Sequence, residues 1–257
     1  MGHSRRRWCV VSVLIAGMCL AWQAPACAQE EFEVRVEQYE RLGRGSFEFE
    51  PHFTYIGEGD RSSNGPVAPP HHQAHFTFEL TGGITDHVSL GLMTLTAVRP
   101  KGGGMGFAGW RLIPHFYVPE SWVPGVKVAL TAEISFPTET YHESSRALEL
   151  KPTIEKQFGR FLFDLNPSVE RSLSMSDRWN LEPSLRVSHQ TDRLFQPSLE
   201  YYGSLREGTH QLYSGGDLDL APNLRWHFGV GFGLTSAGSR VVYKTRLEYE
   251  FGRRQPD

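Results

Sequence analysis

Leu224-Arg225-Trp226-His227-Phe228-Gly229-Val230-Gly231-Phe232-Gly233-Leu234 is the stretch in which residue type alternates without exception. Every even-numbered position holds a large apolar residue, and every odd-numbered position holds a charged residue, an imidazole or a glycine. Because successive side chains of a β-strand point to opposite faces, the pattern predicts a strand with one apolar face and one polar or small face.

A second alternating arm follows the turn predicted at residues 236–239. One face carries Val241, Tyr243, Leu247, Tyr249 and Phe251, and the other carries Lys244, Arg246, Glu248 and Glu250. Each arm is about eleven residues long, close to the roughly 9–11 that a tilted strand needs to cross a bilayer. The two arms therefore predict the last hairpin of a transmembrane β-barrel.

The same alternation recurs upstream as far as Ser46, giving about twelve strands, and an even number is typical of closed bacterial barrels. The longer predicted connections are residues 57–73, 99–105, 138–146 and 172–178, and the shorter ones are 82–87, 159–160, 190–193 and 221–223. Residues 119–125 depart from this alternation. We predict an all-β fold, an antiparallel up-and-down transmembrane barrel over residues 46–251.

Six prolines fall inside the predicted strands, at Pro51, Pro114, Pro152, Pro167, Pro183 and Pro197. Proline lacks the N–H that a sheet ladder needs, so it normally argues against a central strand. All six share the apolar parity, however, which is not expected of loop residues. We predict bulges or interruptions of strand pairing at these positions.

Residues 1–28 have the features of a cleaved secretory signal peptide. Arg5, Arg6 and Arg7 precede an apolar run from Cys9 to Trp22, and Ala26-Cys27-Ala28 supplies a small-x-small cleavage pattern. A lipoprotein modified at Cys27 is the weaker alternative. We expect residues 29–45 to be a periplasmic lead-in that packs at the barrel mouth, and residues 252–257 to be a short polar tail.

Cleavage after residue 28 changes the composition of the chain. Of the 257 residues 229 remain, and since Arg5, Arg6 and Arg7 are lost without any acid, the formal charge moves from −3 to −6. All three cysteines are lost too, which excludes disulfides and thiol chemistry in the mature chain. The acidic balance argues against a nucleic-acid partner, which calls for a basic patch.

Alternation alone does not decide which face meets water. A soluble β-sandwich or lipocalin-like barrel would turn the apolar face inward. Eight strands already enclose a filled or ligand-sized interior, so twelve would leave too much apolar interior to fill. A charged inward face and an uncharged apolar outward face instead predict a barrel surrounded by lipid.

Three short motifs carry a family resemblance: Gly83-Ile84-Thr85-Asp86-His87, residues 230–235 and residues 247–251. They resemble Gram-negative outer-membrane barrels, in particular the family associated with meta-pathway phenol degradation and aromatic uptake. The resemblance implies an outer-membrane location, a small-molecule channel, and recognition of the strand ending at Phe251 by the outer-membrane assembly machinery. Six residues follow Phe251, whereas in such barrels the terminal aromatic residue is usually last.

Charged residues on the inward parity are the predicted functional feature. The lumen charges selected are Glu48, Glu50, Glu79, Glu133, Arg186, Arg225, Lys244, Arg246 and Glu248. Buried carboxylates must be paired or hydrated. A hydrated lumen would make a cation-tolerant passive channel for small solutes, and a fully paired lumen would make a structural or surface-interaction barrel without transport. Both hypotheses stay open, and neither needs a cofactor.

Two further clusters were weighed as chemical sites. His142 and Ser144 resemble the start of an outer-membrane phospholipase motif, but Ser145-Arg146 stands where Asn-Gly would be expected, so we predict no enzyme and keep a lipid hydrolase as a distant third hypothesis. The histidines at 71, 72 and 75 are metal ligands by type. Without a cysteine or clear carboxylate partner they predict an exposed loop cluster, and we predict no metal site.

The first and last strands must pair to close the barrel, with inward residues facing inward residues. We predict a register that sets Glu50 beside Arg246, His52 near Lys244 and Glu48 near Glu248, with Glu50–Arg246 as an ion pair at the seam.

Overall fold

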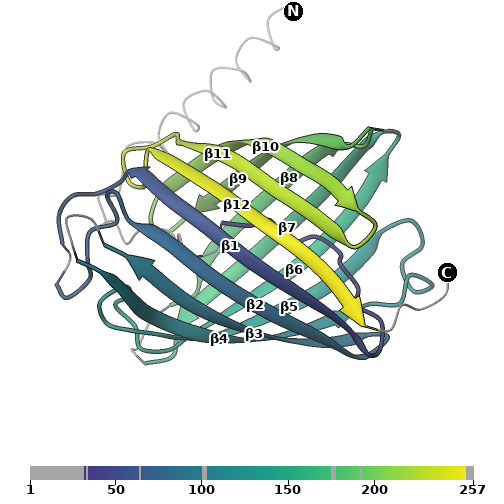
Figure 1. Ribbon diagram of the computed structural model, residues 1–257, viewed down its shortest axis with the longest axis horizontal. Helices are drawn as coiled ribbons and strands as arrows, with labels where there is room; N and C mark the ends of the chain where they lie inside the picture. The colour runs from purple at the N-terminus through teal and green to yellow at the C-terminus, as the bar shows by residue number, and fades with distance from the viewer. Residues whose placement is uncertain are drawn as a thin grey trace, which may run out of the picture.

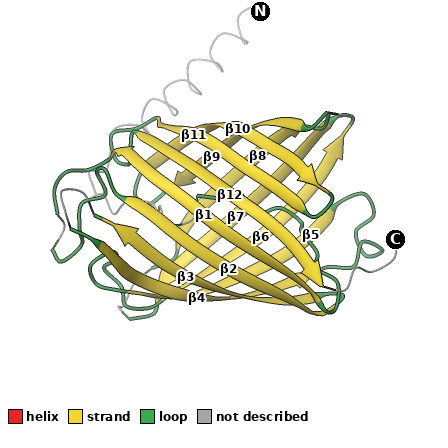
Figure 2. Ribbon diagram, viewed as in Figure 1, coloured by secondary structure: helices red, strands yellow, loops and turns green. Residues whose placement is uncertain are grey.

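Twelve antiparallel strands of the described chain close into one barrel in the computed structural model (Figures 1 and 2). The structure describes residues 32, 34–63, 65–99, 103–174, 178–191 and 193–252. The strands are β1 (Ser46–Glu58), β2 (Ala74–Thr85), β3 (Val88–Val98), β4 (Met105–Tyr117), β5 (Lys127–Pro137), β6 (Ala147–Phe158), β7 (Phe161–Ser172), β8 (Asn180–His189), β9 (Phe195–Ser204), β10 (Thr209–Ala221), β11 (Leu224–Gly233) and β12 (Val241–Gly252). Each strand pairs with its neighbours in the chain, and β1 pairs with β12. The predicted fold is confirmed.

The two ends of the barrel differ in their connections. Odd-numbered strands lead into the longer connections, such as 59–73 and 138–146, and we call this the loop end. Even-numbered strands lead mostly into turns as short as 159–160 and 222–223, and we call this the turn end. The connection 118–126 is the long exception that the sequence predicted. The turn predicted at 82–87 is shorter, because β2 continues to Thr85.

The outward face of the barrel is apolar. Leu92 and Phe232 are 51% and 53% exposed, as expected for side chains that face lipid rather than a protein core. Aromatic residues lie near both strand ends as well as along the strands. At the turn end they include Phe47, Phe116, Phe158, Phe161, Phe195 and Phe251, and at the loop end they include Tyr55, Phe76, Phe107, Tyr201, Phe232 and Tyr243. Among the described residues no helix is long and apolar enough to span a membrane.

The inward face is polar, and glycines on it make room for large neighbours. A Cβ on Gly231 would lie 2.3 Å from the ring of Tyr213, which is buried in the lumen. A Cβ on Gly229 would lie 3.2 Å from the side chain of Lys244. The small odd-numbered positions of β11 therefore provide space for inward side chains of β10 and β12.

The in-strand prolines lie where one of the two ladders of a strand is interrupted. Pro51 pairs with Phe78 of β2, while the β1–β12 register skips from Phe49 to His52. Pro167 pairs with Pro183, while the β6–β7 register skips from Leu150 to Ile154. The predicted loosening of pairing is confirmed, because proline donates nothing on the interrupted side.

The seam between β1 and β12 has a different register from the one predicted. His52 pairs with Arg246 rather than Lys244, and Glu48 pairs with Glu250 rather than Glu248. The inward parity is right but the register is shifted by two residues, because alternation fixes faces and repeats every second position. Glu50 and Arg246 still form an ion pair at 3.1 Å, reached diagonally across the seam.

Residues 34–43 lie inside the barrel, and we call them the luminal segment (Figure 1). The sequence predicted a periplasmic lead-in for this region, so the described part of that prediction is wrong. A lumen enclosed by twelve strands is too wide for the wall side chains to fill alone. Val34 and Val36 pack with Tyr202, Tyr213 and Val242, which supplies the missing volume.

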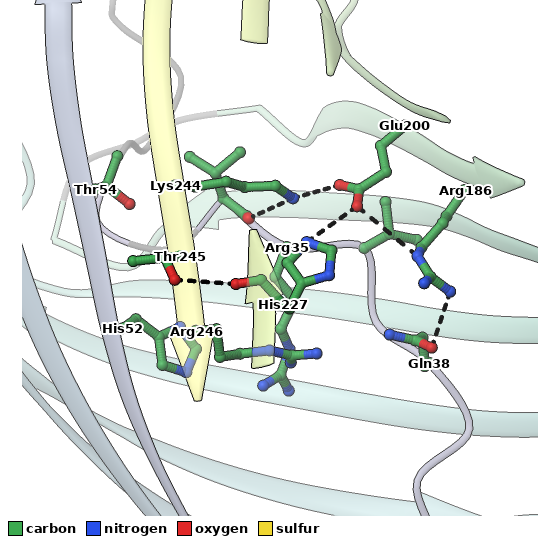
Figure 3. A pocket seen from close by; sticks show the side chains of 12 residues that line it. Arg35, Gln38, His52, Thr54, Arg186, Glu200, His227, Lys244, Thr245 and Arg246 are labelled. Carbon is green, nitrogen blue, oxygen red and sulfur yellow. Dashed lines mark hydrogen bonds and ion pairs between the residues drawn. The ribbon is translucent and has the colours of Figure 1, made fainter. Parts of the chain in front are cut away.

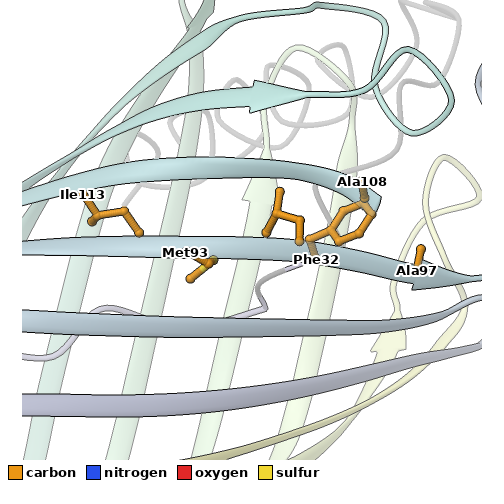
Figure 4. Close-up of a cluster of buried hydrophobic side chains, with 6 residues drawn as sticks. Phe32, Met93, Ala97, Ala108 and Ile113 are labelled. Carbon is orange, nitrogen blue, oxygen red and sulfur yellow. The ribbon is translucent and has the colours of Figure 1, made fainter. Parts of the chain in front are cut away.

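The luminal segment runs between the two ends of the barrel. Near the loop end, Phe32 packs into an apolar cluster with Met93, Leu95, Ala97, Ala108 and Ile113 (Figure 4) and stacks on His75 with the ring centroids 4.0 Å apart. At the turn end the chain passes Gly83 and enters β1, and Gly45 donates a hydrogen bond to the Gly83 carbonyl at 3.0 Å. The predicted signal peptide, residues 1–28, and the tail after Gly252 lie outside the described residues.

Candidate functional site

Side chains of the barrel wall hold the backbone of the luminal segment. Asn166 accepts a hydrogen bond from the Glu37 N–H at 2.7 Å and donates one to the Glu37 carbonyl at 3.1 Å. Lys244 Nζ donates to the Val34 carbonyl at 3.0 Å, and Tyr117 donates to the Glu40 carbonyl at 2.6 Å. Within the described chain, the backbone of residues 34–42 makes no hydrogen bond to the backbone of a strand. The wall therefore binds this segment as it would bind an extended peptide.

Arg35 is the cation through which the luminal segment meets β1 and β2. Its Nη1 lies 3.1 Å from Glu50 Oε2 and 3.7 Å from Glu79 Oε2. Glu37 pairs with the other side of the same guanidinium, at 2.6 Å from Nη2. All four side chains are nine-tenths or more buried. Arg246 of β12 also pairs with Glu50, so two guanidinium groups share this carboxylate.

Glu200 of β9 is the centre of a second charged cluster (Figure 3). Lys244 pairs with one of its oxygens, and the other lies 3.2 Å from His227 Nε2. The opposite ring nitrogen of His227 lies 2.5 Å from Asp217, so the imidazole bridges two carboxylates. Arg186 joins the cluster to the luminal segment by donating to Gln38 Oε1 at 3.0 Å.

A third cluster lies on β4, β5 and β6. Glu133 accepts from Arg111 at 3.1 Å and from Lys151 at 2.7 Å. Both guanidinium and ammonium groups are almost fully buried, as is the carboxylate. Pairing of this density compensates much of the cost of removing charges from water.

A cavity of about 610 Å³ opens at the turn end of the barrel. Its lining includes Glu40 and Arg41 of the luminal segment and Glu48, Arg225 and Glu248 of the wall. Smaller cavities of about 180 Å³ and 50 Å³ lie along the same segment, lined by Gln38 and Tyr39 in one case and by Arg35 in the other. The free volume of the lumen is thus divided around the luminal segment.

The predicted lumen charges all lie on the inward face. Seven of them are buried: Glu50, Glu79, Glu133, Arg186, Lys244, Arg246 and Glu248. Glu48 is half-buried, and Arg225 has 38% of its side chain exposed at the turn-end mouth.

Sequence reasoning missed several luminal groups. Arg35 and Glu37 fell in the presumed lead-in, although their alternation with Val34 and Val36 was a signal of an ordered extended segment. Asn166 carries no charge, so it was not selected as a lumen residue.

His142 and Ser144 do not form a hydrogen-bonded catalytic pair. The Ser144 hydroxyl donates to the Arg146 carbonyl at 2.6 Å and contacts the hydroxyls of Ser172 and Ser174. His142 Nδ1 accepts from the Ser144 backbone N–H at 2.9 Å. These contacts order the loop between β5 and β6.

The histidines near the loop end are divided between two environments. The rings of His71 and His72 contact each other in the 59–73 connection, with centroids 3.8 Å apart and planes tilted by 39°. A hydrogen bond of 3.0 Å joins the Tyr55 hydroxyl to His72 Nδ1. His75 instead points into the lumen, 2.9 Å from Gln73 Oε1. The triplet is therefore not one cluster.

Comparison with known proteins places the fold among solved outer-membrane barrels. The COG4313 outer membrane channel from Pseudomonas putida F1 superposes with a TM-score of 0.58 at 12% identity, covering 85% of this chain and 100% of that one. KdgM porin superposes with a TM-score of 0.52 at 6% identity, covering 80% and 99%. No protein-family model and no curated protein sequence matches the chain.

The fold is that of outer-membrane channel barrels. At this level of identity the likeness concerns the fold alone. It agrees with the resemblance read from the short motifs as far as the class of barrel.

Proposed function

We propose that the protein resides in the outer membrane and is a passive channel for small polar solutes, closed in this structure by the luminal segment. The observation that carries the proposal is how that segment is held. Side chains bind it, whereas continuous backbone ladders hold the wall. Its displacement therefore breaks no strand pairing. The apolar outward face and the likeness to channel barrels support the membrane location.

The width of the open channel follows from what now occupies it. A single extended chain fills the centre of the lumen, so its removal frees about the cross-section of one peptide. Small solutes fit such a bore, and folded proteins do not. Carboxylates outnumber basic groups on the inward face, so cations and neutral molecules should pass more readily than anions. The motif resemblance makes small aromatic compounds a natural first set to test.

The alternative function is a structural or surface-interaction barrel that transports nothing. The dense pairing around Glu133 and Glu200 favours it, because paired charges fill the lumen without need of water. On this alternative the luminal segment is a permanent part of the interior.

A reversible cross-link separates the two functions. We would replace Glu37 and Asn166 by cysteine, because the Asn166 side chain bonds to the Glu37 backbone. No other cysteine would interfere, since all three cysteines of the chain lie in the predicted signal peptide. In planar bilayers the oxidised protein should show no conductance steps, and reduction should restore them. The single variant Asn166→Cys, which has no partner thiol, should conduct in both states.

Two results would contradict the channel. Absence of steps from the folded wild type and from the reduced variant would favour the structural barrel, and steps unaffected by oxidation would show that the segment does not close the pore. Sarkosyl fractionation and heat-modifiable gel mobility test the location, and recovery in the soluble periplasm would refute it. Recognition by the assembly machinery through the strand ending at Phe251, and contact of the outward face with membrane lipids, remain part of the proposal.

A further inference from the structure

Three side chains around the Arg35 guanidinium have the chemistry and spacing of metal ligands. Glu50 and His52 lie two residues apart on β1 and therefore share the inward face, and Glu79 is the β2 residue paired with Glu50. One ligand atom from each lies within 4.8 Å of the other two. His52 Nε2 is 3.3 Å from Glu50 Oε2, a separation close to that of two ligands on one tetrahedral ion with bonds of about 2.0–2.2 Å.

Two of these ligand atoms have an ion-pair contact, His52 Nε2 with Glu50 and Glu79 Oε2 with Arg35, but no hydrogen bond in the described chain. Both atoms are buried, and neither has a hydrogen-bond partner among the described residues. The side chains are 6% and 1% exposed. Buried polar atoms of native proteins nearly always have a partner, so unsatisfied atoms that converge on one point call for an explanation.

The Arg35 guanidinium lies beside two of the three ligands. Its Nη1 is within 3.7 Å of a carboxylate oxygen from both Glu50 and Glu79. The guanidinium supplies positive charge, but in this structure it makes no hydrogen bond to His52 Nε2. A metal ion would bond to that nitrogen in its acceptor form. Arg35 is carried by the luminal segment, and not by the wall that carries the three ligands.

We propose that Glu50, His52 and Glu79 form a site for a divalent transition-metal ion of the Zn²⁺ type, and that the ion and the Arg35 guanidinium exclude each other. Two carboxylates and one imidazole match the oxygen and nitrogen ligands of such ions. The ion replaces the charge that leaves with Arg35, while Arg246 continues to pair with Glu50.

A regulatory consequence follows, and this step rests on the proposed channel. A ligand that binds only when Arg35 has left favours the displaced state of the luminal segment. Conversely, a change that populates the displaced state raises the apparent affinity for the metal in proportion to that population. Metal binding and channel opening are then two readouts of one equilibrium.

The binding test uses the full mature chain folded in detergent, titrated with ZnCl₂ against a chromophoric chelator. His71→Gln and His72→Gln are built into every protein to remove the exposed imidazole pair. Arg35→Met should bind one Zn²⁺ at least tenfold more tightly than this background. Adding His52→Gln should lower the affinity again by about tenfold or more, since even the loss of an outer-shell partner costs about 10–100-fold.

His227→Gln is the matched control for His52→Gln. His227 is also a buried luminal histidine between two carboxylates, but Asp217 and Glu200 contact opposite ring nitrogens and cannot share an ion with it. It should leave the Zn²⁺ affinity of Arg35→Met unchanged. Equal affinity of Arg35→Met with and without His52→Gln, or no gain from Arg35→Met, overturns the site.

A second measurement keeps the proposal testable if Arg35→Met fails the heat-modifiability check for folding. In bilayers, Zn²⁺ should raise the open probability of the background protein, and His52→Gln should abolish the rise while His227→Gln preserves it. Channels that open without any response to Zn²⁺ contradict the metal site and leave the channel standing. Zn²⁺ binding without any conductance contradicts the channel and leaves the metal site standing.

Discussion

The barrel wall and the luminal segment are stabilised in different ways. In the wall every strand is hydrogen-bonded to two neighbours, and the ring has no free edge. In the luminal segment the backbone groups of Val34, Glu37 and Glu40 are bound one at a time by side chains from separate strands. We therefore expect the wall to unfold cooperatively, whereas the contacts of the luminal segment can be lost one at a time.

The energies differ accordingly. A buried hydrogen bond whose partner is removed costs about 1–3 kcal/mol, more when a charge is involved. Such hydrogen bonds, the ion pairs of Arg35 and the packing of Val34 and Val36 together hold the luminal segment. A substitution at one contact removes part of this total and raises the population of the displaced segment accordingly. We expect substitutions at these contacts to change the position of the segment while the barrel stays folded.

The largest effect is expected from a substitution that fills the space beside Gly83 of β2, where the luminal segment passes the wall. A Cβ on Gly83 would lie 2.1 Å from the Gly43 carbonyl oxygen, a backbone atom that cannot turn aside. Gly83→Val should expel the segment, since the strain exceeds the about 1–3 kcal/mol of ordinary overpacking. Hydrogen exchange at Glu37 and Tyr39 should reach the rate of an open chain while gel mobility stays heat-modifiable.

Gly82→Val is the control for that variant. A Cβ on Gly82 meets only the ring of Phe47, at 3.1 Å, and a side chain can rotate away. In Gly82→Val, hydrogen exchange at Glu37 and Tyr39 should stay slow. Equal exchange in the two variants would mean that the segment does not need the gap beside Gly83.

The next effect in size concerns the seam, where wall and segment share Glu50. Arg246→Glu leaves Glu50 facing another carboxylate at the seam, which should cost up to about 3–5 kcal/mol. The swap with Glu50→Arg should recover only part of that loss, because Arg35 lies 3.1 Å from Glu50 and would then face an arginine. Adding Arg35→Met should recover more, because it removes the repulsion between two guanidinium groups without setting a new carboxylate beside Glu37 and Glu79. The measurement is the urea midpoint of heat-modifiable folding. A double variant as stable as wild type would show that Arg35 contributes nothing at the seam.

The smallest effect concerns Asn166, which bonds the luminal segment and also Thr153 and Ser184 of the wall. Asn166→Ala removes both hydrogen bonds to Glu37, at about 1–3 kcal/mol. Exchange of the Glu37 N–H should accelerate by about tenfold or more, while the N–H groups of the strand ladders keep their slow exchange. Asn180→Ala is matched, because that buried asparagine bonds Glu182 and Ser204 of the wall. Unchanged exchange in Asn166→Ala would show that the segment is held elsewhere.

The sequence was sufficient to predict the wall because each strand alternates by itself. Charged residues on one parity and uncharged apolar residues on the other indicated which face turns inward. The seam register was wrong by two residues, because Glu50 satisfies the inward rule equally well beside several positions of β12.

The luminal segment was not predictable in the same way. Residues 32–37 alternate as in a short strand, residues 37–41 fit a helical turn equally well, and neither pattern indicates a partner. The contacts that place the segment join positions as far apart as Glu37 and Asn166, or Val34 and Lys244. The candidate metal site was missed for a related reason, because Glu79 meets His52 only through the pairing of two strands.

The location of the luminal segment also constrains the order of assembly. The segment immediately precedes β1, and the ring closes where β1 meets β12. If the ring closed first, an extended chain would have to be threaded lengthwise past buried side chains. If the ring closes around the segment, no threading is needed, and Arg35 neutralises Glu50 before the seam forms. The segment would then act as an internal template around which the strands of the barrel assemble.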